Sequence, residues 1–199
     1  MTEDGFRTYA RERGLEFQAE EEVAPLTPFL AMGDRRWFGP VLAGRLPGGI
    51  EGRLARYRYE RRSRRAVHDY EFTIVISELP ETTVFVPRLV CEGRAVERDH
   101  AEPAFEMRSS RLWQESVAFS DRFRVVADPH QDQNWLRQLF SPAFLTWLTD
   151  EAPEGFSFEL VYGVMCANRE GDDSSPKSLD RLCETSAGVA ERIRKECAE

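Results

Sequence analysis

The stretch DPHQD carries the residue types best suited to chemistry. Asp128, His130 and Asp132 place two carboxylates around an imidazole, and these groups bind metals and transfer protons. A metal site needs a third or fourth ligand at a recognised spacing, and neither Asp99 nor His100 stands at one. The sequence therefore predicts no metal site and no cofactor.

Helix initiation accounts for most of the same stretch. Asp128 precedes Pro129, and Gln131 stands three residues after Asp128, so the pattern is close to a capping box with proline at the first helical position. We predict a helix over residues 129–140 with Asp128 as its N-cap. His130 is the residue that this interpretation leaves over, and it remains a candidate ligand-binding side chain.

Arginines cluster between residues 53 and 65, where tyrosines separate several of them. Guanidinium groups beside tyrosine rings are typical of surfaces that bind phosphate or nucleic acid. The alternative is a solvated strand face whose arginines pair with surplus acids, and the net charge of −8 favours it because it opposes binding to nucleic acid. The candidate ligand-binding set is Arg56, Arg58, Arg61, Arg62, Arg64 and Arg65.

Nucleophilic catalysis has little support in the sequence. Neither G-x-S-x-G nor G-x-x-x-x-G-K-[ST] occurs, and PGGIEG lacks the lysine and the following helix of a phosphate-binding loop. Without a C-x-x-C pair the cysteines fit neither a zinc ribbon nor a disulfide scaffold, so we expect free thiols. A pair of Cys91 with His68 or His100 stays open as the basis of a cysteine-dependent enzyme. The cysteines are Cys91, Cys166, Cys183 and Cys197.

The elements that would position these side chains are mostly strands. Alternating or β-branched runs predict strands at 15–19, 37–46, 50–62, 68–77 and 83–90, with a hairpin turn at 47–49. In the third of these, Ala55, Tyr57 and Tyr59 share one face. Pro87 indicates an edge strand or a bulge. Residues 117–127 predict further strand interrupted at Ser120-Asp121, and 156–171 predict a hairpin turning at Tyr162-Gly163.

Helices are predicted at 4–13, at 129–140, from Pro142 onward, and at the end of the chain from about Leu179. Residues 91–111 are expected to be a loop with a short helix at 101–107. The apolar residues of the two middle helices are expected to face the core: Trp135, Leu136, Leu139, Phe140, Phe144, Trp147 and Leu148. Runs of strands that do not alternate with helices predict an α+β fold, a mostly antiparallel sheet with helices packed on one face.

Length and composition agree with one domain spanning residues 1–199, because 199 residues at 41% hydrophobic content can bury a single core. No apolar run reaches the roughly 18 residues of a membrane helix. The start MTEDGFRTYARERG lacks the apolar middle of a signal peptide. These features predict a cytoplasmic protein with no membrane span.

Three segments resemble a family of uncharacterised soluble proteins from actinobacteria: GDRRWFGPVLAGRLPGGIEGRLARYRYE, ESVAFSDRFRVVADP and WLRQLFSPAFLTWLTDEAPEGFSFELVYGVMCAN. The resemblance runs from about Gly33 to the last helix. It implies an intracellular or membrane-associated α+β domain of unknown function and supplies no catalytic residues. Family members tend to have a longer polar stretch where this chain has RRSRRA, so the resemblance does not extend to the arginine cluster.

The expectation from sequence is a non-catalytic module that binds a protein partner or a small ligand, rather than an enzyme. The alternative is an anion or RNA binder that uses the arginine-rich strand and hairpin. A metal- or cysteine-dependent hydrolase is the weaker alternative.

Overall fold

The computed structural model describes residues 2–22, 24–62, 66–86, 88–94, 108–109, 116–171 and 175–198. Within these residues nine strands form one antiparallel sheet in the order β1-β2-β3-β4-β9-β8-β5-β7-β6. The strands are β1 (Glu16–Gln18), β2 (Arg35–Arg45), β3 (Glu51–Arg62), β4 (Val67–Glu78), β5 (Arg88–Gly93), β6 (Arg108–Ser109), β7 (Phe123–Ala127), β8 (Phe156–Val161) and β9 (Val164–Glu170).

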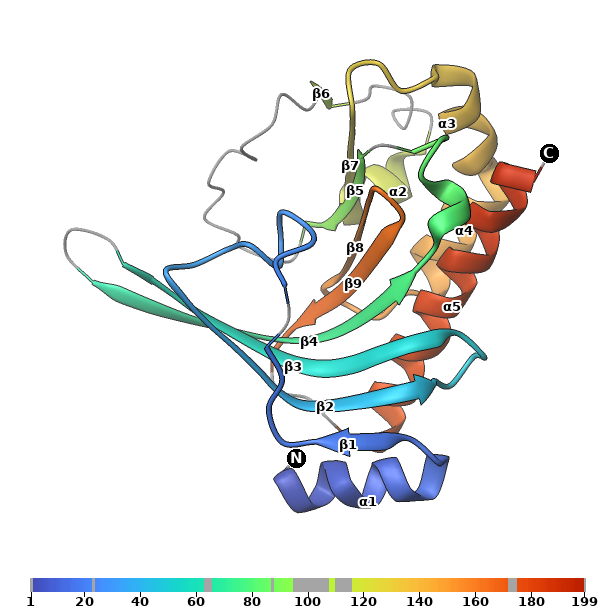
Figure 1. Cartoon of the computed structure of the whole chain (residues 1–199). Coiled ribbons are helices and arrows are strands. Elements are labelled where there is room, and N and C mark those ends of the chain that lie inside the picture. Colours follow the sequence, from blue (N-terminus) through green and yellow to red (C-terminus); the bar gives the residue numbers. More distant parts are fainter. Residues whose placement is uncertain are drawn as a thin grey trace.

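Helices cover one face of this sheet (Figure 1). They are α1 (Glu3–Arg13), α2 (Val117–Arg122), α3 (Gln133–Leu139), α4 (Pro142–Glu151) and α5 (Pro176–Ala198), and a 3-10 turn, η1, spans Pro80–Thr82. Leu54, Val75 and Leu160 of the sheet pack with Leu148 of α4 and Leu182 of α5 in the main core. The predicted α+β fold with helices on one face is confirmed.

The second face of the sheet has its own aromatic cluster. Tyr57 of β3 and Phe72 of β4 pack against Phe29, which comes from the turn that follows β1. The Phe29 N–H donates to the buried carboxylate of Glu159 on β8, at 3.0 Å to Oε1. This turn is therefore tied to the middle of the sheet by both packing and hydrogen bonding.

The first hairpins follow the predicted pattern. Ala55, Tyr57 and Tyr59 lie on the second face, and β3 pairs with β4 without interruption from Arg53–Ile76 to Arg62–Val67. In Figure 1 this ribbon extends past the helices. The β8–β9 hairpin turns at Tyr162-Gly163, where both residues have positive φ.

Two strand predictions need correction. Residues 83–85 form a turn after η1 rather than a strand, because the Phe85 and Val86 N–H groups both donate to the Thr82 carbonyl. The strand begins only at Arg88, and β5 lies between β8 and β7 instead of at an edge. Pro87, on which the edge prediction was based, lies outside the described residues.

Residues 117–122 are also different from the prediction, since they form the helix α2 and not a strand. The Ser116 hydroxyl accepts from the Phe119 N–H and caps this helix. The helix turns Phe119 into the core, and β7 begins at Phe123. The conflict in alternation at Asp121 is thus resolved by a helical turn. The loop predicted over 91–111 is wrong at both ends, because residues 91–93 belong to β5 and Arg108–Ser109 form β6; residues 95–107, with the predicted helix at 101–107, lie outside the described residues.

The helix after DPHQD begins later than predicted. Asp132, not Asp128, is the N-cap of α3, and its carboxylate accepts from the Asn134 and Trp135 N–H groups. Asp128 instead accepts from the His130 N–H within a turn. Gln131 is buried and donates to the Phe85 carbonyl, so its side chain joins this turn to the one after η1.

Two successive short helices, α3 and α4, are confirmed, with Pro142 in the first turn of α4. The apolar residues predicted to face the core are all buried with one exception, Trp147, which is only half-buried. Within the described residues no helix is long and apolar enough to cross a membrane.

Candidate functional site

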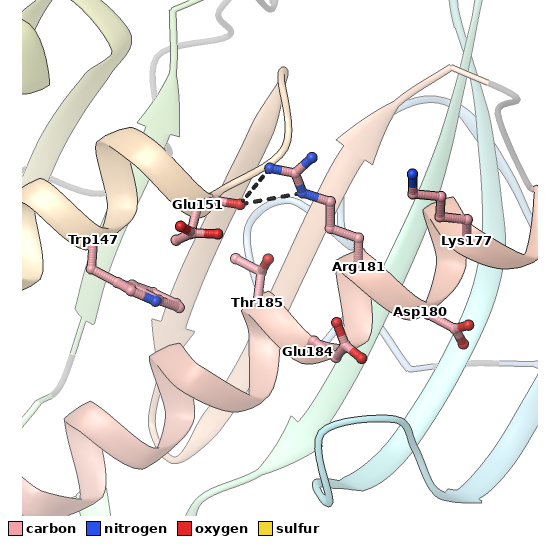
Figure 2. A pocket seen from close by; sticks show the side chains of 7 residues that line it. All are labelled: Trp147, Glu151, Lys177, Asp180, Arg181, Glu184 and Thr185. Carbon is pink, nitrogen blue, oxygen red and sulfur yellow. Dashed lines mark hydrogen bonds between the residues drawn. The ribbon is translucent and has the colours of Figure 1, made fainter.

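A groove of about 670 Å³ lies between α4 and α5, on the outer side of the helical layer (Figure 2). Its volume is in the range of ligand sites in proteins, roughly 300–1,000 Å³. One aromatic side chain and charged groups of both signs line it. The lining residues are Trp147, Glu151, Lys177, Asp180, Arg181, Glu184 and Thr185.

Trp147 forms a wall of the groove, and its position is determined by packing. Its ring stacks on Phe144, with centroids 5.7 Å apart and planes 11° from parallel. On the α5 side the ring lies over Gly188, where an added Cβ would be 2.7 Å from Trp147 Cζ2. Only glycine therefore allows the indole to lie this close to the α5 backbone.

Arg181 connects the two helices across the groove. Its Nη2 donates to the Glu151 carbonyl oxygen at 3.0 Å, and Figure 2 shows the guanidinium reaching from α5 to the end of α4. The last carbonyls of a helix lack intrahelical donors and carry partial negative charge. The Arg181 guanidinium therefore caps the C-terminus of α4, and its N–H donors lie at the groove.

Asp180 is held from the other side by α1. Tyr9 donates to Asp180 Oδ1 at 2.7 Å, and Arg13 donates to both carboxylate oxygens, at 2.8 and 2.6 Å. Burial disfavours the charged form, but the hydrogen bonds from Arg13 and Tyr9 outweigh it and lower the pKa of Asp180. The carboxylate is therefore ionised and accepts three hydrogen bonds, and its lowered pKa makes it a poor general base.

Lys177 and Glu184 differ from Asp180 because both are exposed and neither makes a hydrogen bond or ion pair within the described part of the chain. They lie on the same helix as Arg181, four residues before it and three residues after it. The groove thus offers an aromatic wall, free donors and a free carboxylate to an incoming ligand.

The structure distributes the predicted arginine set over both faces of β3. Arg56, Arg58 and Arg62 alternate with the buried Tyr57 and Tyr59 and lie on the helix-face side of the strand. By the same alternation Arg61 lies on the second face. Arg64 and Arg65 lie outside the described residues.

Arg56 and Arg58 already have partners. Arg56 forms an ion pair with Glu71, and the Arg58 guanidinium lies over the Trp37 ring, 4.4 Å from its centroid. The Arg62 side chain is exposed, and its backbone N–H donates to Asp34. Part of the predicted arginine set therefore already contacts other residues of the sheet.

His130 is exposed and lies far from the arginines. Its loop adjoins the start of β5, where the Asp128 N–H donates to the Arg88 carbonyl. Across the sheet, Arg88 at the start of β5 is in register with Glu78 at the end of β4. Arg62 pairs with Val67, which lies at the other end of β4. At about 3.3 Å per residue the separation along β4 is roughly 35 Å. His130 and the arginines therefore do not form one site.

Three of the four cysteines have thiols that burial makes harder to ionise. Burial raises the pKa of Cys91 well above its usual value and that of Cys183 to about 12, and it also raises the pKa of Cys197. His68 is exposed near the β3–β4 turn, away from the fully buried Cys91, and His100 lies outside the described residues. Within the described residues, likewise, no group of His, Cys, Asp or Glu could hold a metal ion.

Sequence reasoning missed the groove because its residues fit ordinary roles. Trp147 matched the core pattern, and Lys177 and Arg181 matched the solvated face of the last helix. The available signal was Gly188, a glycine inside a long helix, which is unfavourable by about 1 kcal/mol relative to alanine unless close packing requires it.

Comparisons with known proteins show a likeness in fold. No protein-family model and no curated protein matches the sequence. A solved structure, the crystal structure of the mycobacterial trehalose monomycolate transport factor A, TtfA, is similar with a TM-score of 0.58. The sequence identity is 8%, and the match covers 96% of this chain and 93% of that chain. At this identity the likeness concerns the fold alone.

Proposed function

We propose that this protein is a non-catalytic binding module whose α4–α5 groove holds a small, hydroxyl-rich ligand such as a sugar. The observation that carries the proposal is the fixed Trp147 ring beside charged donors and acceptors from two helices. A sugar ring has apolar C–H faces that pack on an indole, and its hydroxyls hydrogen-bond to carboxylates and guanidinium groups.

The engagement of Asp180 with Tyr9 and Arg13 supports a binding role, since these hydrogen bonds lower the pKa of the carboxyl group and make it a weak base. The similar solved structure is that of a trehalose monomycolate transport factor. We therefore propose an accessory role in transport for this chain. We also propose a cytoplasmic location, because all four cysteines are free, as expected in a reducing compartment.

Trehalose and a short-chain trehalose monoester are the ligands that test the proposal. Isothermal titration should show binding of the ester, and Trp147→Ala should weaken it by about tenfold or more, the scale of one well-packed aromatic contact. Trp37→Ala is the matched control, because Trp37 lies on β2 away from the groove.

Three results would count against the proposal. Binding that is equal in Trp147→Ala and the original protein would exclude the groove, and no binding of either sugar would exclude this ligand class. Release of free fatty acid from the ester during incubation with the protein would show that the module is an enzyme.

A further inference from the structure

A second cavity lies at the edge of β2, beside the segment that follows β1. This β2 cleft has a volume of about 870 Å³ and is lined by residues 19–22, 24–25, 34 and 36–40 together with Glu3 and Arg56. Trp37, Phe38 and Pro40 supply apolar surface, so the cleft combines apolar walls with charged side chains. It shares no lining residue with the α4–α5 groove.

The charge of the β2 cleft is negative. Its acids are Glu3, Glu20, Glu21, Glu22 and Asp34, against the guanidinium groups of Arg36 and Arg56. Arg56 is neutralised by Glu71, which is not part of the lining.

Two of the five acids, Glu3 and Glu21, pair with arginines outside the cleft, Arg7 and Arg53. Glu20 and Glu22 are exposed and have no ion-pair partner within the described ranges. The uncompensated charge therefore favours a cationic occupant and disfavours nucleic acid.

The backbone of β2 is open along the same cleft. β1 pairs only with Val41–Ala43, and beyond it the Glu21 N–H donates to the Phe38 carbonyl. In an extended strand the N–H and C=O of one residue point to the same side, and the direction alternates along the chain. The Phe38 N–H and both backbone groups of Arg36 therefore point away from β3 into the cleft.

We propose that the β2 cleft binds a short extended peptide of a partner protein, which adds to the edge of β2 and carries arginine or lysine side chains. Strand addition supplies main-chain hydrogen bonds at Arg36 and Phe38. Glu20 and Glu22 attract the basic side chains, and Trp37 provides a surface for their apolar stems. The charge of the cleft and the open edge of β2 thus both favour an extended peptide with basic side chains.

A fluorescein-labelled hexapeptide of alternating arginine and threonine tests this proposal by fluorescence anisotropy. The double variant Glu20→Arg, Glu22→Arg should weaken binding at least about tenfold, as expected for loss of complementary charge. The control Glu154→Arg, Glu191→Arg changes two exposed acids elsewhere and gives the same net charge, so it should leave binding nearly unchanged. Unfolding curves verify that both variants fold.

A second peptide separates strand addition from simple attraction of charge. N-methylation of alternate residues removes backbone donors, and loss of one such hydrogen bond of about 1 kcal/mol should weaken binding about fivefold. Equal weakening by both double variants would overturn the proposal in favour of general surface charge. Equal binding of the methylated peptide would overturn the edge-strand mode.

Discussion

At the scale of single residues, Gly188 determines the shape of the α4–α5 groove. An added Cβ would lie 2.7 and 2.8 Å from two atoms of the Trp147 ring. Such overpacking costs about 1–3 kcal/mol, whereas alanine gains about 1 kcal/mol in helix propensity over glycine. We therefore expect Gly188→Ala to lower the free energy of unfolding by about 1 kcal/mol, measured by urea denaturation.

The Trp147→Ala background provides the control for this prediction. With the indole removed, the clash is absent and the propensity gain remains, so Gly188→Ala should become neutral or stabilising there. If Gly188→Ala destabilises both backgrounds equally, then the contact with Trp147 does not explain the glycine.

Two acids in DPHQD have different structural roles. Asp132 caps α3 by accepting from two backbone N–H groups, whereas Asp128 accepts from one N–H in the preceding turn. Asp132→Ala should therefore cost about 1 kcal/mol of unfolding free energy, the usual value of an N-cap. Asp128→Ala should cost less, and thermal or urea unfolding of both variants measures the difference. A larger loss in Asp128→Ala would contradict the assigned cap.

At the scale of elements, Asp180 joins α1 to α5. The pKa of Asp180 is lowered in the folded protein, so the interaction stabilises the fold above the unfolded pKa of about 4 and is lost as the pH falls through the folded pKa. Asp180→Asn should cost about 1.5 kcal/mol at pH 7, because it removes charge-assisted hydrogen bonds to Arg13 and Tyr9.

The pH dependence gives this prediction its specific test. Urea unfolding at pH 7 and at pH 2.5 should show that the difference between the original protein and Asp180→Asn shrinks at low pH. Glu184→Gln is the matched control, since Glu184 is an exposed acid on the same helix, and it should change the unfolding free energy by less than about 0.5 kcal/mol. A difference that persists at pH 2.5 would contradict the role of the ionised carboxylate.

The elements that could be predicted are those with a long local pattern. β3 and β4 are each twelve residues long and alternate over Ala55–Tyr59 and Tyr70–Ile74, and α5 keeps its apolar spacing from Leu179 to Ile193. The six-residue helix α2 has no such length, so its apolar residues fit a strand equally well. The start of α3 was misplaced because both acids of DPHQD satisfy the local capping pattern, and tertiary contacts of Gln131 decide between them.

At the scale of the whole molecule, the two cavities show why sites were harder to predict than elements. Each joins segments that are distant in the sequence: α4 with α5 in one, and α1, the segment after β1 and β2 in the other. The order of the strands in the sheet brings these segments together, and the pattern of a single sequence does not specify that order. The arginine cluster, by contrast, was evident in the sequence, but alternation along β3 separates its members.

The alternative of RNA binding depends on how these charges combine over the molecule. The net charge is −8, and the exposed Glu20 and Glu22 lie in a cleft that Arg56 also lines. We therefore expect a 20-nucleotide poly(U) strand to bind no tighter than the non-specific range, about 10⁻⁵ M at 150 mM salt. Fluorescence anisotropy across a salt series measures this affinity.

Paired variants distinguish Arg58 and Arg62 from the other two arginines of the set that the structure describes, Arg56 and Arg61. The double variant Arg58→Ala, Arg62→Ala removes two side chains from one face of β3. We expect it to abolish the weak binding of poly(U), because these two side chains together provide that binding. Arg56→Ala with Arg61→Ala should have little effect, because Arg56 is paired with Glu71 and Arg61 lies on the opposite face. A different outcome would be submicromolar affinity for poly(U) that both double variants weaken equally. This outcome would show that the whole cluster acts as one RNA-binding surface, because each phosphate contact makes its own salt-dependent contribution to the affinity.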